Sequence, residues 1–100
     1  MSKTKAERIY QKDLVKKIKE MFTGCVVTKL DPRYTQGIPD LLILYNDKWA
    51  TLECKAYAKA KRRPNQGYWV DRLNKMSFSS FIYPENEKEV LDDLQRAFQS

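Results

Sequence analysis

The sequence predicts a single α/β domain in which a helix, three strands, a helix, a fourth strand and a last helix follow one another. A chain of 100 residues has room for one modest hydrophobic core. Apolar side chains recur with helical spacing in three segments, and short runs of strand-forming residues lie between them. The 42% of apolar and 12% of aromatic residues argue against disorder.

The three helices are predicted over residues 4–22, 64–76 and 85–98. Pro64 suits the first turn of the second helix, and Gly24 supplies a stop after the first. In each helix, apolar side chains with helical spacing form the stripe that we expect to be buried. These stripes are Tyr10, Leu14, Ile18 and Met21 or Phe22; Trp69, Val70, Leu73 and Met76; and Val90, Leu91, Leu94, Ala97 and Phe98.

The strands are predicted over residues 25–30, 41–45, 48–52 and 78–83, and the middle two have the pattern of a β-hairpin. Asn46-Asp47 separates them, and both residue types tolerate the positive φ angles of a two-residue turn. A turn centred there pairs Tyr45 with Lys48. Counting outward then places Asp40 opposite Glu53, on the same face of the sheet.

This hairpin brings together a set of side chains suited to phosphodiester hydrolysis. Strand periodicity places Lys55 on the face of Glu53 and turns Cys54 to the other side. Because Mg²⁺ prefers oxygen ligands, Asp40, Glu53 and the backbone carbonyl of Cys54 are its candidate ligands. Lys55 would orient or deprotonate an attacking water. The alternative is a structural acid pair neutralised by a lysine, but like charges opposite each other destabilise a sheet, which favours a cation between them.

The basic charge of the chain indicates a polyanionic partner. The net charge is +6 and the isoelectric point is near 9.4. The lysines of residues 3–19 are typical of a solvated helix face. A second basic group lies beside or just after the acid pair, where it would bind a nucleic-acid backbone. Its members are Lys29, Arg33, Lys59, Lys61, Arg62 and Arg63.

Composition also excludes several classes of function. The chain has no histidine, which excludes Ser-His catalysis and histidine-ligated zinc sites. Cys25 and Cys54 have no metal-binding spacing, so we expect buried free thiols in a reducing compartment. No apolar run is long enough to cross a bilayer, and neither end has the pattern of a signal peptide. We therefore expect a soluble intracellular protein with no membrane partner.

Three motifs carry a resemblance to a known family. Gly37-Ile38-Pro39-Asp40, Glu53-Cys54-Lys55 and Gln66 resemble the VRR-NUC family of the PD-(D/E)XK nuclease superfamily, including its small stand-alone phage members. The match covers nearly the whole chain, as one nuclease domain of residues 1–100. It implies a mixed four-stranded sheet flanked by helices, with Asp40 and Glu53 as metal ligands and Lys55 as the catalytic lysine.

The resemblance implies two further site residues, and each has a structural alternative. Gln66 would lie beside the active lysine or the DNA phosphate, although a glutamine there also serves as a helix cap. Glu7 would be the first-helix glutamate that completes the metal site. Thr4-Lys5-Ala6-Glu7 is, however, a capping-box pattern, in which Glu7 bonds to a free amide.

The function implied by the resemblance is a Mg²⁺- or Mn²⁺-dependent endodeoxyribonuclease without a small-molecule cofactor. Its expected substrate is branched DNA, as for a Holliday-junction resolvase, and its expected state is a homodimer that cuts opposed strands. Its location would be the host cytoplasm if the protein is phage-encoded. Two alternatives stay open: a non-catalytic basic nucleic-acid-binding module, and a nuclease that acts on RNA.

Overall fold

The computed structural model describes residues 3–100, and its helices and strands occur in the predicted order. They are α1 (Lys5–Met21), β1 (Val26–Lys29), β2 (Leu41–Tyr45), β3 (Lys48–Cys54), α2 (Gln66–Met76), β4 (Phe78–Ile82) and α3 (Glu87–Gln99). The chain is thus an α/β domain. Within residues 3–100 no helix is long and apolar enough to span a membrane.

The four strands form one mixed sheet in the order β1-β2-β3-β4. β1 and β3 both run antiparallel to β2, whereas β4 runs parallel to β3. Tyr45 pairs with Lys48 and Leu41 with Leu52, so the predicted hairpin register is confirmed. Asn46 takes the positive φ of 55° that the tight turn requires. Asp40 and Glu53 are the next positions outward along the two strands.

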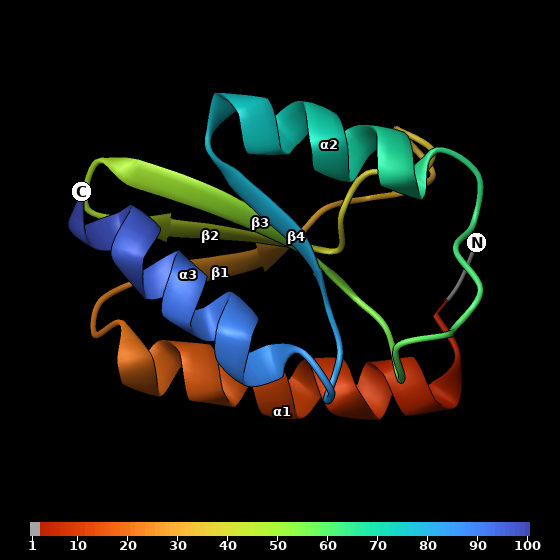
Figure 1. Cartoon of the computed structure of the whole chain (residues 1–100), viewed down its shortest axis with the longest axis horizontal. Helices are drawn as coiled ribbons and strands as arrows, with labels where there is room; N and C mark the ends of the chain where they lie inside the picture. Colours follow the sequence, from red (N-terminus) through yellow and green to blue (C-terminus); the bar gives the residue numbers. More distant parts are fainter. Residues whose placement is uncertain (1–2) are drawn as a thin grey trace.

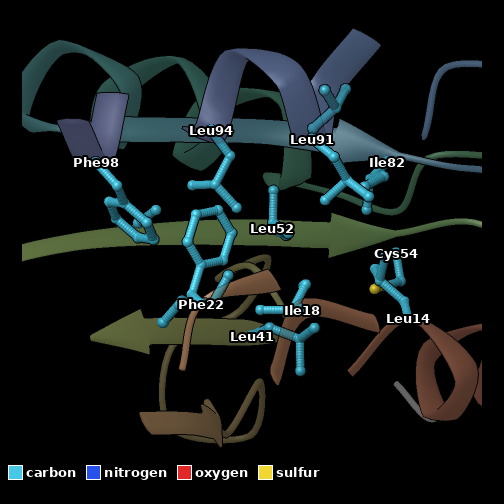
Figure 2. Close-up of a cluster of buried hydrophobic side chains, with 13 residues drawn as sticks. Leu14, Ile18, Phe22, Leu41, Leu52, Cys54, Ile82, Leu91, Leu94 and Phe98 are labelled. Atoms are coloured by element: carbon cyan, nitrogen blue, oxygen red, sulfur yellow. The ribbon is translucent and has the colours of Figure 1, made fainter. Parts of the chain in front are cut away.

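Helices cover both faces of the sheet. Figure 1 shows α1 and α3 on one face and α2 on the other. The core lies in the layer between the sheet and the pair α1–α3, where side chains from all three interlock (Figure 2). Each fully buried Leu or Ile contributes about 1.5–3 kcal/mol. This layer therefore fixes where the N-terminus of α1 meets the sheet. Its members include Leu14, Ile18, Phe22, Leu41, Ile43, Leu52, Cys54, Ile82, Leu91, Leu94 and Phe98.

Three local predictions were wrong. The second helix begins at Gln66 rather than Pro64, because Asn65 has a left-handed backbone with φ 69° that cannot continue a helix. Met76 is 58% exposed, because it ends the helix instead of facing the sheet. Cys25 is only partly buried and precedes β1, whereas the free thiol of Cys54 is buried in the core as expected.

Candidate functional site

The candidate site lies at the end of the sheet where β3 stops. The backbone N–H of Cys54 donates to Oδ2 of Asp40 at 2.9 Å, which joins the two strands of the hairpin just beyond their register. The N–H of Lys55 donates to the carbonyl of Ile82 at 2.9 Å, so pairing with β4 continues past the end of β3. Asp40, Glu53 and Lys55 are thereby held by the backbone at one end of the sheet.

A cation from the chain itself lies between the two carboxylates. Nζ of Lys3 is 2.6 Å from Oδ2 of Asp40 and forms an ion pair with Oε2 of Glu53. It also donates to the carbonyl of Cys54 at 2.7 Å. These oxygens belong to three of the four groups that were predicted as metal ligands, the fourth being Glu7. Sequence reasoning missed Lys3, because nothing distinguished it from the other lysines near the N-terminus.

Burial governs the charge of this cluster. Glu53 is 1% exposed, and burial together with the charge of Asp40 raises its pKa to about 7, against the opposing effect of Lys3 and Lys55. Burial alone would lower the pKa of Lys3. The attraction of Glu53 and Asp40 outweighs that effect, so the pKa of Lys3 is raised and its ammonium form is favoured. The cluster is therefore an acid pair that requires a cation.

Gln66, the first residue of α2, bonds directly to the acid pair. Its Nε2 donates to Oε2 of Glu53 at 3.0 Å, while its Oε1 accepts from the N–H of Arg63 at 2.8 Å. The side chain is buried, so both bonds form away from water. Gln66 thus orients the Glu53 carboxylate and also holds the segment ahead of α2, while its predicted place beside the active lysine or a DNA phosphate stays a prediction.

Lys55 is buried at the same end of the sheet. Its Nζ donates to the carbonyl of Lys61 at 3.1 Å and lies 3.8 Å from Oε2 of Glu7. Burial, reinforced by Lys3, lowers the pKa of Lys55, although Glu53 and Glu7 act in the opposite direction. A buried lysine with a lowered pKa beside an acid pair is typical of a catalytic site.

Glu7 forms the predicted capping box and also contacts the site. Its N–H donates to Oγ1 of Thr4 and its Oε1 accepts from the N–H of Thr4, both at 3.1 Å. The same carboxylate lies near Lys55 and is 3.6 Å from Arg63. Burial raises the pKa of Glu7, but the Thr4 amide and these cations outweigh it, so the net shift is downward. Its role as a metal ligand stays a prediction.

The donor set suits a hard divalent cation. In the described chain, no three Asp, Glu, Cys or His side chains form a metal-binding group, so the set is two carboxylates and one backbone carbonyl. Mg²⁺ is often bound by one or two carboxylates and keeps several waters. Within residues 3–100, the buried Oε1 of Glu53 has no hydrogen-bond partner, so this carboxylate has an acceptor left to bind a cation. Asp40, Glu53 and the Cys54 carbonyl therefore fit such an ion.

The loop ahead of Asp40 packs against the start of α2 through Gly37. Gly37 has a φ of +86°, and a Cβ on it would lie 2.6 Å from the carbonyl carbon of Asn65. Only glycine permits this backbone contact. A cavity of about 40 Å³ lies between the loop and the site. Its lining includes Lys3, Gln36, Gly37, Asp40, Glu53, Arg63 and Gln66.

A larger hollow lies on the other side of Glu7. Its volume is about 430 Å³, and small side chains such as Ala6, Ala56 and Ala60 leave it open. Its lining also includes Thr4, Glu7, Tyr57, Lys61, Arg63 and Pro64. The hollow is thus bordered by basic residues and lies within reach of the site, since Glu7 and Arg63 contact both.

The predicted nucleic-acid-binding residues differ in how freely they face solvent. Lys59 and Lys61 are exposed in the loop after β3. The guanidinium of Arg62 lies 3.7 Å above the ring of Phe81, whereas Arg63 turns inward to Glu7.

The two remaining basic residues lie on the other side of the acid pair. Lys29, at the end of β1, lines a shallow hollow together with Lys3 and Asp40. Arg33 is held by Asp31 through two side-chain hydrogen bonds, so its charge is already paired.

Comparison with known proteins identified no relative of this chain. No protein-family model, curated protein or solved structure shows a significant match to the chain.

Proposed function

We propose that this chain is a metal-dependent endonuclease with a PD-(D/E)XK active site, similar to the VRR-NUC family. The observation that carries the proposal is the convergence of Asp40, Glu53 and the Cys54 carbonyl on one cation position, beside a buried lysine. Mg²⁺ or Mn²⁺ held there would lower the pKa of a bound water and stabilise charge that develops on the phosphate.

The residues around this position have separate tasks in the proposed reaction. Lys55 orients the attacking water or takes its proton, which its lowered pKa favours. Gln66 keeps the Glu53 carboxylate directed at the cation position. Glu7 and the Lys61 carbonyl hold the Lys55 side-chain nitrogen in place.

DNA is the proposed substrate, and the basic loop after β3 supplies its contact surface. Lys59, Lys61 and Arg62 would bind backbone phosphates, and the hollow beside Glu7 has room for a flanking nucleotide. A domain of 11.8 kDa covers only part of a four-way junction. We therefore propose branched DNA and a homodimer together, on the strength of the resemblance.

A second function has one specific observation in its favour. Lys3 already neutralises Asp40 and Glu53, so the acid pair has a structural counter-ion within the chain. In that case the protein would be a basic nucleic-acid-binding module that cuts nothing. It would bind with strong salt dependence and would be insensitive to chelator.

The experiment that separates the two functions is a cleavage assay with purified protein. Labelled four-way-junction, flap, linear duplex and RNA substrates are incubated with Mg²⁺, Mn²⁺ or EDTA. We expect metal-dependent cleavage that Asp40→Asn and Lys55→Met each reduce by at least about 100-fold. Asp47→Asn and Lys88→Ala, which change exposed charges on the hairpin turn and on α3, are the matched controls.

Each negative result has a definite meaning in this assay. Absence of cleavage under every metal condition, or cleavage that survives both site variants, refutes the enzyme and leaves the binding module. Cleavage of linear duplex alone refutes the preference for branched DNA. Cleavage confined to RNA replaces the proposed substrate.

A further inference from the structure

We infer that Lys3 is a built-in competitor for the divalent-cation site, and that a metal ion binds only by displacing the Lys3 side chain. This inference rests on the proposed function, because it assumes that the acid pair binds a metal ion. It adds that the side chain of Lys3 occupies the site in the metal-free protein.

The first argument is that both cations need the same oxygens. Nζ of Lys3 contacts Asp40, Glu53 and the Cys54 carbonyl, which together are the donor set available to a metal. An ammonium and a divalent ion repel each other strongly at such short range in a partly buried site. Occupancy by one therefore excludes the other.

The second argument is that displacement needs only rotation of a side chain. The backbone at Lys3 is fixed through the peptide group that joins Lys3 to Thr4. Thr4 is the N-cap of α1, and Nη1 of Arg8 donates to the carbonyl of Lys3 at 2.7 Å. An open hollow of about 220 Å³, lined in part by Lys3, Arg8, Lys29 and Asp40, gives the displaced ammonium a route to solvent.

The third argument is that the buried acid pair is stabilised by a cation. Glu53 is 1% exposed and shares the Lys3 ammonium with Asp40, so removal of that positive charge would leave two neighbouring carboxylates without a counter-ion. Lys3 supplies that charge before metal arrives. The consequence is a higher metal concentration for half-saturation, because only molecules with Lys3 displaced can bind metal.

The test measures metal binding without DNA and without cleavage. Calorimetric titration of the whole protein with MnCl₂ compares wild type with Lys3→Gln and with Lys5→Gln. Lys5 is exposed two residues away and carries the same charge, so it controls for general electrostatics. If Lys3 fills the site in about nine molecules out of ten, Lys3→Gln will bind Mn²⁺ roughly tenfold more tightly. Lys5→Gln will match wild type.

A second measurement uses wild-type protein and so does not depend on how the variant folds. Lysine side chains are acetylated briefly with and without MnCl₂, and each site is quantified by mass spectrometry. The side chain of Lys3 is 13% exposed in its ion pairs, so we expect its labelling to increase severalfold when Mn²⁺ displaces it. Labelling of Lys5 will not change.

The possible outcomes distinguish a failure of this inference from a failure of the proposed function. Cleavage by wild type with unchanged Mn²⁺ affinity in Lys3→Gln, or with unchanged Lys3 labelling, overturns the competition and leaves the nuclease. Tighter Mn²⁺ binding in Lys3→Gln and Mn²⁺-dependent labelling without any cleavage support the competition and overturn the nuclease. If Mn²⁺ binds neither protein, the competition is wrong as well.

Discussion

Gly37 lies directly against the backbone of Asn65, so that a Cβ on Gly37 would be 2.6 Å from the Asn65 carbonyl carbon. This contact joins the loop that ends at Asp40 to the residue that precedes Gln66. The acid from the hairpin and the amide from α2 are therefore positioned by one close approach of two backbones. The glycine of the G-I-P-D motif therefore has a structural role, because its backbone permits this contact.

Substitution of Gly37 should separate these two segments. Gly37→Ala is expected to reduce the free energy of unfolding by about 2 kcal/mol or more, because alanine disfavours a φ of +86° and its Cβ collides with backbone atoms. Urea unfolding measures the change. Gly67→Ala is the control, since its Cβ meets no atom within 4 Å and lies in α2. It should be neutral or slightly stabilising, and equal effects of the two substitutions would contradict the argument.

Gln66 is expected to act through Glu53 rather than on the substrate. Gln66→Leu keeps the side chain's size but removes the donor to Oε2 of Glu53, so the Mg²⁺ concentration for half-maximal cleavage should rise about 10–100-fold. The rate of cleavage is measured as a function of Mg²⁺, and Gln95→Leu, at an exposed position of α3, is the control. An unchanged Mg²⁺ requirement would show that the hydrogen bond does not position Glu53.

Glu87, which lies away from the candidate site, should make the free energy of unfolding depend on pH. It ion-pairs with Lys17 and accepts from the hydroxyl of Tyr10 at 2.8 Å. Burial raises its pKa, but these partners outweigh burial and the net shift is downward from 4.5. A lowered pKa in the folded state contributes stability above the unfolded pKa, and that stability is lost as the pH falls through the folded pKa.

The matching measurement compares Glu87→Gln with wild type by thermal unfolding at several pH values. At pH 7 the variant should be less stable by about 1 kcal/mol. The difference should shrink as the pH falls below 4.5 and through the lowered pKa of Glu87, because the wild-type carboxylate then loses its charge. Glu89→Gln, in the same first turn of α3 but exposed, controls for the helix terminus. A difference that is independent of pH would rule out the charged contact as its cause.

The exposed lysines of the loop after β3 should contribute to DNA binding more than Arg33 does. Lys59→Ala and Lys61→Ala are each expected to lower the slope of log affinity against log salt by about 1 in magnitude. Arg33→Ala should have a smaller effect, because Asp31 already pairs with that guanidinium. Fluorescence anisotropy at several salt concentrations, with EDTA present to prevent cleavage, measures the slopes. Equal slopes for all four proteins would refute the proposed contact surface.

Sequence patterns predicted the parts of this structure that depend on local periodicity. The helix stripe of Leu14 and Ile18 and the pairing of Tyr45 with Lys48 follow from spacings of 3.6 and 2, and both are confirmed. The hairpin count also brought Asp40 and Glu53 together. Such patterns extend over a few residues, which is why they predicted these parts of the structure, although Met76 of the second stripe is exposed.

The features that were missed depend on contacts between distant segments. Lys3 reaches Glu53 across 50 residues of sequence, and no periodicity marks one lysine among many for that contact. Asn65 ends the segment before α2 in a left-handed conformation and lies against Gly37, so the helix begins later than Pro64 suggested. Glu7 was predicted to be either a helix cap or a metal ligand; the structure confirms the cap and places the same carboxylate near Lys55 and Arg63.

The capping box of α1 has a practical consequence for any engineered form of the protein. Thr4 begins the helix and is covalently bonded to Lys3, so a tag or fusion partner added ahead of them would crowd the residue that fills the acid pair. The last residues of α3 lie at the opposite end of the molecule from the start of α1 (Figure 1). An attachment point at the end of α3 is therefore preferable to one beside Lys3.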